Sequence, residues 1–341
     1  MKSESRLTLA GLAKLAGVST STASRALNDN PLIKLETRQK IQALAKKHNY
    51  SVNAAASRLR TQRTNVIAVI LNLIDHTEQS ITDPFLLKVV GELNQALNAK
   101  GYELLLSNSF MASSDWANYF IASQRADGLI VVGQGKSSAK MDAAASAGAP
   151  IVVWGDPKLA ADYPIVGGDN HSGGFQATWH LIQGGCKKLL FLGDPEHAEM
   201  SERHAGYCAA HDKAGLARDP SMTIPIDITS TAAYECIHQL IRDKGLFFDG
   251  IVCISDMVAL GALKALKERY VSIPSDVAIV GYDDIALAGL MHPSMTTIRQ
   301  DTRQAAERMV EQLLRQFNGQ PTSSEVVDIQ LIRRETTRAE K

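Results

Sequence analysis

The chain has few of the residues and runs that metal sites, disulfide scaffolds and membrane spans require. Its 341 residues include four cysteines and no CxxC pair, which disfavours a zinc site or a disulfide framework and favours a reducing compartment. No apolar run is long enough to span a bilayer, and the polar start MKSESRLTLA lacks a signal-peptide core. We therefore expect a soluble cytoplasmic protein that does not contact a membrane.

The motifs of common enzyme classes are also missing from the sequence. It has no GxxxxGK[ST] loop, no HExxH and no GxSxG, and its nine histidines show no metal-ligand spacing. The run 133–138 (GQGKSS) resembles a truncated dinucleotide-binding loop, but Ser138 stands where the third glycine belongs. A solvated loop is the alternative interpretation of that run. We expect no catalytic residues, no metal and no cofactor, and hence no enzyme.

The net charge of zero hides an uneven distribution of charge along the chain. Residues 1–65 carry twelve lysines and arginines against three acidic residues, a net +9, and the rest of the chain carries −9. A small basic segment on a larger acidic body indicates a polyanionic partner such as nucleic acid. A basic solubilising arm is the alternative, but this segment also has helical periodicity.

The basic segment is predicted to form three short helices. Thr8 caps the first helix, whose apolar residues recur at spacings of three and four, and Gly17 ends it. Ser19 caps a second helix over residues 20–27, and a third helix spans about 35–48. Two short helices joined by a glycine-containing turn form a helix-turn-helix, whose second helix enters the major groove of DNA.

Three residues of the second helix face away from its apolar side, where base-reading side chains must lie. They are Thr20, Ser21 and Arg25, and Arg25 carries the guanidinium that contacts guanine with two hydrogen bonds. A further alanine-rich helix is predicted at 53–60 (NAAASRLR), and it is too short to be stable alone in water. It either folds on contact with DNA and a partner copy or serves as an interdomain linker, and both interpretations are compatible.

The remaining chain alternates apolar strand-like runs with helix-length segments. The predicted strands are 66–73, 102–107, 128–132, 151–153, 189–192, 250–254 and 277–280, and the predicted helices are 85–99, 201–214, 232–244 and 257–269. Continuous Val/Ile/Leu runs of this kind indicate parallel sheets covered on both faces. The fold class expected is therefore an all-α N-terminal helix-turn-helix domain followed by a two-lobed α/β sensor domain with two doubly wound parallel sheets. Ligands bind such sheets beyond the carboxyl ends of their strands, so we expect a cleft between the lobes.

The run TLAGLAKLAGVSTSTASRALND, with TRQKIQALAKKHNYSVNAAASRLRT after it, resembles the N-terminal domain of the LacI/GalR (lactose-repressor/galactose-repressor) family of transcription regulators. The resemblance continues along nearly the whole chain through RHAGY at 203–207, SDMVALGALKAL at 255–266 and IPSDVAIVGYDD at 273–284. It implies a dimeric DNA-binding regulator, usually a repressor, with a periplasmic-binding-protein-like body that senses a small molecule. Most family members sense sugars.

The resemblance also assigns DNA contacts to residues of the head and of the predicted 53–60 helix. The implied base-reading residues are Thr20, Ser21 and Arg25, the implied phosphate contacts are Thr22, Ser24, Asn28, Tyr50 and Asn53, Leu59 is the implied minor-groove wedge, and Arg60 beside it is a further implied contact. This chain departs from the family at Val52, where a proline usually precedes the asparagine of that helix.

Effector contacts are implied for residues at the expected cleft. They are Phe85, Trp154, His197, Glu199, Arg203, Asp256 and Asp283. Five of them have a structural alternative: core packing for the two aromatic residues, a surface helix position for Arg203, and helix capping for Asp256 and Asp283. Helix capping is also the alternative for the neighbouring Asp284.

The expected domains are a helix-turn-helix domain at 1–52, a hinge helix and linker at 53–65, and an effector-binding and dimerisation domain at 66–341. The resemblance implies three crossings between the lobes, near Ile165, Met291 and Thr322. The first lobe would then comprise 66–164 and 292–321, the second would comprise 165–291, and 322–341 would return toward the second lobe.

The partners expected are palindromic double-stranded operator DNA, a second copy of the chain in a homodimer, and a small-molecule effector. The function expected is allosteric control of operator affinity, in a nucleoid-associated repressor of carbohydrate-utilisation genes. A sugar is the expected effector, and a purine or nucleoside is the alternative. A transport-type solute-binding protein is the alternative class, although it has no use for a +9 head.

Overall fold

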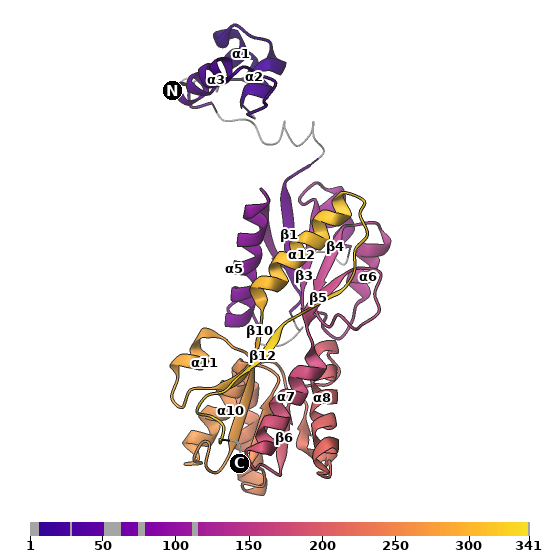
Figure 1. The fold of residues 1–341 in the computed structure, drawn as a ribbon, viewed down its shortest axis with the longest axis vertical. Helices are drawn as coiled ribbons and strands as arrows, with labels where there is room; N and C mark the ends of the chain where they lie inside the picture. The colour runs from indigo at the N-terminus through magenta and orange to yellow at the C-terminus, as the bar shows by residue number, and fades with distance from the viewer. Residues whose placement is uncertain (1–6, 28, 51–62, 74–78, 111–114, 340–341) are drawn as a thin grey trace. The chain divides into compact units, whose positions relative to one another are not determined.

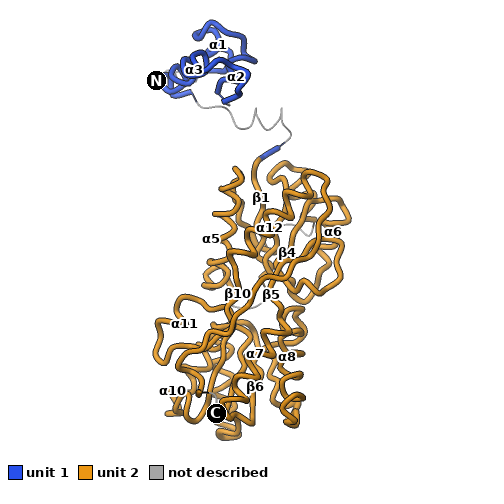
Figure 2. The backbone as a smooth tube through the Cα atoms, in the orientation of Figure 1, with its two compact units in different colours: residues 1–64 blue, residues 65–341 orange. Residues whose placement is uncertain are grey.

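The computed structural model describes residues 7–27, 29–50, 63–73, 79–110 and 115–339. The chain divides into two compact units, a head that ends at Thr64 and a body that begins at Asn65 (Figure 2). The body therefore starts one residue before the expected position. No helix within the described ranges is both long and apolar enough to cross a membrane.

The described part of the head forms three helices, as expected. They are α1 (Leu9–Ala16), α2 (Thr20–Leu27) and α3 (Leu35–Lys47). The Thr8 hydroxyl accepts the backbone N–H of Gly11 at 3.1 Å, and the Ser19 hydroxyl accepts that of Thr22 at 3.1 Å, so both predicted N-caps are present. Gly17 ends α1 in the left-handed conformation with φ +72°. Buried apolar side chains form the core of this unit; they are Leu12, Ala16, Ala26, Ile41 and Ala45.

The first lobe of the body is built on a six-stranded parallel sheet (Figure 1). Its strand order is β11-β5-β4-β3-β1-β2, with β1 (Val66–Leu71), β2 (Glu103–Asn108), β3 (Gly128–Val132), β4 (Ile151–Trp154), β5 (Ile165–Gly168) and β11 (Glu325–Val327). All six residues of β1 are buried, since alternate side chains enter opposite cores. Helices α5 (Pro84–Ala99) and α12 (Thr302–Phe317) cover one face, and η1 (Ala117–Ala122) and α6 (Ala139–Ser146) cover the other.

The second lobe repeats this architecture with one antiparallel strand. Its sheet order is β12-β10-β9-β8-β6-β7, with β6 (Leu189–Leu192), β7 (Thr223–Ile224), β8 (Gly250–Cys253), β9 (Ala278–Asp283), β10 (Thr296–Gln300) and β12 (Ile329–Ile332). β12 pairs antiparallel with β10, and the other pairs are parallel. The helices are α7 (Asn170–Gln183), α8 (Ala198–Ala214), η2 (Pro220–Met222), α9 (Ser230–Lys244), α10 (Asp256–Glu268) and α11 (Ala286–Leu290). The two doubly wound lobes expected from the sequence are thus confirmed.

The chain crosses between the lobes three times, at Asp169, Asp301 and Asp328. Each crossing joins an element of one lobe to an element of the other: β5 to α7, β10 to α12, and β11 to β12. Two of these aspartates cap the next helix, since Asp169 accepts the N–H of Ser172 and Asp301 accepts that of Gln304, both at 2.9 Å.

The crossings lie further along the chain than the expected positions near Ile165, Met291 and Thr322. Ile165 begins β5 of the first sheet, so the lobe boundary follows that strand. The segment 296–300 was expected in the first lobe, but it forms β10 beside β9 of the second sheet. The segment 325–327 forms β11 beside β5 of the first sheet, so the chain returns to the second lobe only after it.

Candidate functional site

Helix α2 presents its expected base-reading side chains to solvent. Thr20, Ser21 and Arg25 are exposed, whereas Ala23 and Ala26 of the same helix are fully buried against the head core. The hydroxyls of Ser21 and Thr22 each lie 2.8 Å from that of Ser19, so the cap and the start of this helix form one hydroxyl cluster. The exposed stripe has the residue types and the helical spacing that direct readout in a major groove requires.

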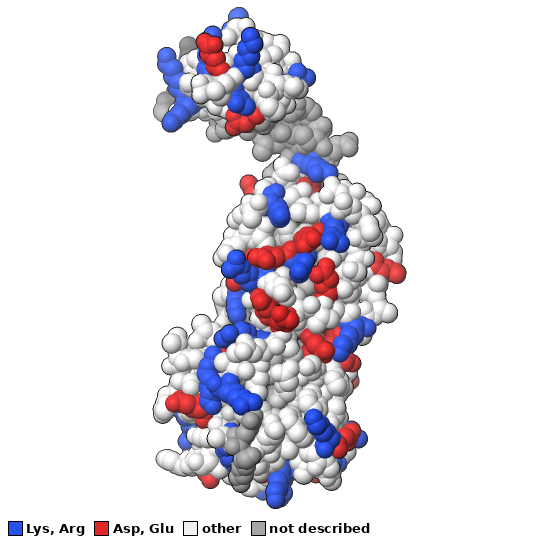
Figure 3. Space-filling model, in the orientation of Figure 1, with Lys and Arg blue, Asp and Glu red and all other residues white. Residues whose placement is uncertain are grey.

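The residues with implied phosphate contacts differ in their surroundings. Ser24 is half-buried, and Tyr50 packs against the head core, so its ring has a structural role as well. Asn28, Asn53, Leu59 and Arg60 lie outside the described residues, and so does the whole predicted 53–60 helix. Lysine and arginine side chains are visible on the surface of the head in Figure 3, in agreement with its net positive charge.

The body contains a cleft at the carboxyl ends of the strands of both sheets. Its cavity has a volume of about 100 Å³. Its described lining includes six of the seven expected effector residues, Phe85, Trp154, His197, Glu199, Arg203 and Asp283, and also Asn72, Gln79, Asp83, Asn170, Ser255 and Gln300. The cleft therefore combines aromatic faces with charged and amide side chains, as small-molecule sites do.

Arg203 reaches the cleft from α8 and is almost entirely buried. Its Nε–H donates to Asn170 Oδ1 at 2.9 Å, a second N–H donates to the carbonyl of Ile254, and its guanidinium lies 3.6 Å from the centre of the Tyr282 ring. These contacts fix the plane of the guanidinium, so its remaining N–H groups have a defined direction. The alternative of a surface helix position for Arg203 is wrong.

Asp283 ends β9 and is 6% exposed. Its Oδ1 accepts one hydrogen bond from Gln300 Nε2 at 2.9 Å. Burial raises the pKa of Asp283 well above its ordinary value, and the neighbouring charge of Arg203 opposes that rise. A carboxyl group in this position gains most from a ligand that supplies hydrogen-bond donors, because such donors stabilise the ionised form.

A chain of polar contacts joins the two lobes across the base of the cleft. Glu199 of α8 accepts the backbone N–H of Gln134 at 3.1 Å, and Gln134 Oε1 accepts that of Asp156 at 2.6 Å. Asp156 Oδ2 then accepts from Asn170 Nδ2 at 3.1 Å. Burial raises the pKa of Glu199. Because the Glu199–Gln134 and Asp156–Asn170 bonds run from one lobe to the other, changes in lobe orientation break or form them.

A second connection between the lobes lies at the rim of the cleft. Lys136 follows β3 in the first lobe, and its Nζ lies 2.6 Å from Asp194 Oδ2 and 2.8 Å from Glu196 Oε2 of the second lobe. His197 is buried behind these acids and lines the cleft, and burial lowers its pKa. Its imidazole is therefore held toward the neutral form at neutral pH.

Phe85 and Trp154 meet inside the cleft rather than in separate cores. Their rings are edge to face, with centroids 5.8 Å apart. Phe85 is half-buried and packs against the cores of both lobes, whereas Trp154 is 5% exposed. Both residues have packing roles, and both also present aromatic surface to the cavity.

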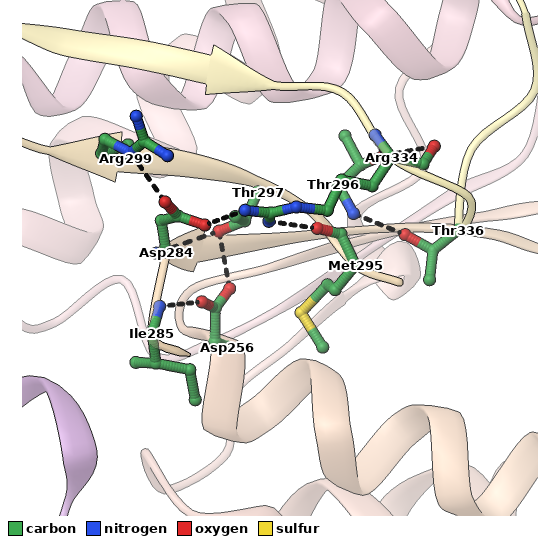
Figure 4. Close-up of polar contacts among 9 residues, drawn as sticks. All are labelled: Asp256, Asp284, Ile285, Met295, Thr296, Thr297, Arg299, Arg334 and Thr336. Atoms are coloured by element: carbon green, nitrogen blue, oxygen red, sulfur yellow. Dashed lines mark hydrogen bonds and ion pairs between the residues drawn. The ribbon is translucent and has the colours of Figure 1, made fainter. Parts of the chain in front are cut away.

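Asp256 is not among the described residues that line the cavity. Ser255 lines the cavity and caps α10 by accepting the N–H of Val258 at 3.2 Å, whereas Asp256 is the first residue of that helix. Asp256 instead accepts the Thr297 hydroxyl at 2.6 Å and the Ile285 N–H at 2.9 Å (Figure 4). Burial raises the pKa of Asp256 to about 7.

Helix capping, the alternative interpretation of Asp284, does not explain its position. Helix α11 begins after Ile285, and the Asp284 carboxylate is held by Arg299 and Arg334, each at 2.7 Å (Figure 4). Burial raises its pKa, but the hydrogen bonds from Arg334 and Arg299 outweigh that effect and leave the pKa below its ordinary value.

A helix-turn-helix head joined to a two-lobed body with a polar cleft defines a DNA-binding transcriptional regulator with a sensor domain. The profile described as bacterial regulatory proteins, lacI family, matches residues 8–53, and the profile described as periplasmic binding protein-like domain matches 178–337. The HTH-type transcriptional repressor PurR of Haemophilus influenzae (strain PittGG) is 30% identical over 322 residues, which cover 92% of this chain and 93% of that protein. The chain belongs to the LacI family of bacterial regulators.

Other relatives and solved structures agree with this assignment. The HTH-type transcriptional regulator CelR of Thermobifida fusca is 28% identical over 326 residues, covering 94% of this chain and 95% of that protein. A solved transcriptional regulator CelR–cellobiose complex has a TM-score of 0.72 at 27% identity, covering 96% of this chain and 99% of that one. The lac repressor dimer bound to operator and the anti-inducer ONPF has the same fold, with a TM-score of 0.83 at 23% identity and coverage of 97% and 99%. The named relatives are regulators, and a transport-type binding protein is not favoured.

Proposed function

We propose that this regulator is a homodimer that binds a palindromic operator and represses genes of carbohydrate use, under the control of an uncharged sugar bound in the cleft. The observation that carries the sugar assignment is the combination of Arg203 and Asp283 with the Phe85–Trp154 pair. Carboxylate and guanidinium groups bind hydroxyls through charge-assisted hydrogen bonds, and an aromatic face packs on the apolar side of a sugar ring. The CelR relative is solved as a complex with cellobiose, which supports this class of ligand.

The proposed DNA contacts are those of an exposed recognition helix. Thr20, Ser21 and Arg25 would read base edges, and Thr22, Ser24, Asn28, Tyr50, Asn53 and Arg60 would contact phosphates. Leu59 would insert at the operator centre, where two copies meet. A palindrome is proposed because a dimer with two-fold symmetry presents the same helix to two half-sites.

The proposed mechanism is a population shift of the body. An effector that binds Arg203 and Asp283 of the second lobe and Phe85 and Trp154 of the first favours one lobe orientation over the other. The lobe orientation then sets how the paired heads meet DNA.

The direct test is a thermal-shift and calorimetric screen of the full chain against cellobiose, ribose, other sugars, and nucleobases and nucleosides. A ligand at 100 times its dissociation constant stabilises the folded body by about 2.7 kcal/mol, which a shift in melting temperature detects. Operator binding is then measured with and without each hit. Binding of a sugar that changes operator affinity supports the proposal, and a screen in which no sugar binds contradicts it.

A purine or nucleoside is the second candidate effector. It is favoured by the aromatic surface of Phe85 and Trp154, on which a flat base also stacks. The same screen separates the candidates, since a nucleoside hit without a sugar hit replaces the sugar assignment and leaves the regulator class unchanged.

A further inference from the structure

Two consecutive aspartates at the end of β9 have a backbone conformation that non-glycine residues rarely adopt. Asp283 has φ +112° and Asp284 has φ +51°. Such residues cost of order 1–3 kcal/mol each and persist where surrounding contacts determine them. The two neighbouring carboxylates diverge. Asp283 lines the cleft, whereas Asp284 points to the opposite side of the strand end, toward Arg299 and Arg334.

The Asp284 carboxylate is held by two arginines from different segments (Figure 4). Arg299 Nε donates to Oδ2 from β10, and an Arg334 N–H donates to Oδ1 from the segment after β12, both at 2.7 Å. The Asp284 side chain is 8% exposed and that of Arg334 is 19% exposed. Arg334 also donates to the carbonyl of Met295 at 2.7 Å, so its guanidinium is itself fixed at both ends.

Asp256 fixes the residue that follows the pair. Its Oδ2 accepts the backbone N–H of Ile285, and its Oδ1 accepts the Thr297 hydroxyl, as Figure 4 shows. Thr297 in turn accepts the backbone N–H of Asp284 at 3.4 Å. The left-handed turn is therefore held by bonds to the Asp284 carboxylate and to the backbone N–H groups of Asp284 and Ile285.

We propose that Arg334 is a positioning residue for the cleft, which acts through Asp284 to hold Asp283 toward the ligand. The inference rests on the proposed role of Asp283 in effector binding, because Arg334 affects the effector only if Asp283 contacts it. Arg334 is not among the described residues that line the cavity, so it reaches the cleft through this turn. Arg299 is the weaker of the two partners, since 47% of its side chain is exposed and water competes for it.

The experiment compares Arg334→Gln with Arg303→Gln in the full chain. Arg303 is an exposed arginine of α12 that pairs with Glu307 on the same helix, so its loss controls for removing a surface charge. Crystal structures of both variants report the φ angles of residues 283 and 284 and the 2.9 Å distance between Asp283 Oδ1 and Gln300 Nε2. Calorimetry with cellobiose reports ligand affinity, and melting temperature reports the fold.

The expected result for Arg334→Gln is a relaxed turn, a longer Asp283–Gln300 distance and an affinity for cellobiose about tenfold weaker, equal to the loss of one hydrogen bond of about 1.4 kcal/mol. Arg303→Gln should match the parent in all three. An unchanged turn in Arg334→Gln overturns the proposal. If Arg334→Gln does not fold, Asp284→Asn removes the ion pair with Arg334, together with that of Arg299, at constant size, and an unchanged turn in that variant overturns the proposal equally.

Failure of the proposed function gives a different pattern. If cellobiose and the other sugars do not bind the parent, the sugar assignment fails, but the crystal structures still decide whether Arg334 holds the turn. If sugars bind the parent and both variants alike although the turn has relaxed, the sugar assignment stands and the positioning role is wrong.

Discussion

Arg25 and Arg203 carry the same side chain, but their surroundings give them opposite properties. Arg25 is exposed on α2, so its guanidinium is free to meet a guanine edge, and ordering it costs side-chain entropy only on binding. Arg203 is 7% exposed, and Asn170, the carbonyl of Ile254 and the Tyr282 ring fix its orientation before any ligand arrives. Preorganisation of this kind lowers the cost of binding a small molecule.

Replacement of Arg25 by alanine should weaken operator binding by roughly 1–3 kcal/mol and leave binding to random DNA nearly unchanged, because base contacts supply discrimination. The measurement is a salt-controlled binding titration on both DNAs. Lys14→Ala, which removes another exposed charge of the head, is the control and should weaken both complexes alike. If Arg25→Ala weakens binding to operator and to random DNA equally, Arg25 contacts a phosphate and not a base.

Arg203→Ala and Asp283→Ala should abolish the response to effector and keep the effector-free operator affinity of the parent. Loss of one partner of a charge-assisted hydrogen bond costs roughly 1.5–3 kcal/mol of ligand binding, and coupling between sites is reciprocal. Operator titrations with and without ligand, beside calorimetry, measure both effects. Normal ligand binding by either variant would remove that residue from the site.

The buried Asp256 predicts a dependence of stability on pH. Burial raises its folded pKa to about 7, above an unfolded value near 3.9, so the native state binds the proton more tightly. The contribution of Asp256 to stability is then greatest below about pH 4, and it falls as pH rises to about 7, by at most about 1.4 kcal/mol per pH unit. Denaturant titrations of the parent and Asp256→Asn across this range should show the difference between them shrinking or reversing with rising pH. A constant difference would mean that Asp256 does not titrate there.

At the scale of elements, the contact between α7 and α8 depends on glycines. A Cβ on Gly206 of α8 would overlap the carbonyl oxygen of His171, and a Cβ on Gly174 of α7 would overlap that of Arg203. The two helices therefore approach at backbone distance, and this approach places Asn170 beside Arg203 in the cleft.

The substitution Gly206→Ala should consequently destabilise the body by roughly 1–3 kcal/mol through overpacking. Gly91→Ala in α5 is the matched control, since a Cβ at that position would have no neighbouring atom within 4 Å, and alanine should be neutral or stabilising there by up to about 1 kcal/mol. Chemical denaturation of both variants gives the comparison. Equal stability of the two variants would contradict the close contact.

The sequence predicted those elements whose local pattern and tertiary role agree. The long Val/Ile/Leu strands and the capped helices of the head fall into this group. Helix α7 was not predicted, because its Gly173 and Gly174 oppose helix formation; Gly174 is explained by the close contact with α8, and Gly173 by the Tyr282 ring of β9. Strand β10 reads TTIRQ, without an apolar run, and owes its strand to pairing with β9 and β12.

Cleft residues could be predicted from the sequence where the local pattern alone decides which side chain faces the cavity. Six cleft residues were found from the sequence, but Ser255 and Asp256 are adjacent, and only the cap geometry of α10 decides which of them faces the cavity. Asn170 and Gln300 were missed because Asn170 begins α7 and Gln300 ends β10, two elements that the sequence did not reveal.

At the scale of the whole body, the two lobes are joined by three single-residue crossings, by the Glu199–Gln134 and Asp156–Asn170 hydrogen bonds, and by the Lys136 contacts at the rim. Lys136→Ala should shift the lobes toward an open arrangement, because it removes both ion pairs to Asp194 and Glu196. Spin labels on exposed positions of each lobe, at Ala143 and Ser201, measure the separation.

The control for that experiment is Lys140→Ala, whose ammonium group donates within the first lobe to the carbonyl of Ser109. It should leave the label distances as in the parent. High salt should move the parent toward the Lys136→Ala distribution, since it screens exposed ion pairs. Identical distributions for Lys136→Ala and the parent would show that the rim contacts do not hold the lobes together.

The small volume of the cleft also sets a limit on how fast this regulator responds. A cavity of about 100 Å³ is smaller than the roughly 300–1,000 Å³ of ordinary ligand sites, so an effector enters only while the lobes are apart. The observed binding rate should then stop rising with effector concentration and level off at the rate of lobe opening. Above that concentration, more effector gives no faster change in operator binding, because the opening of the lobes sets the rate.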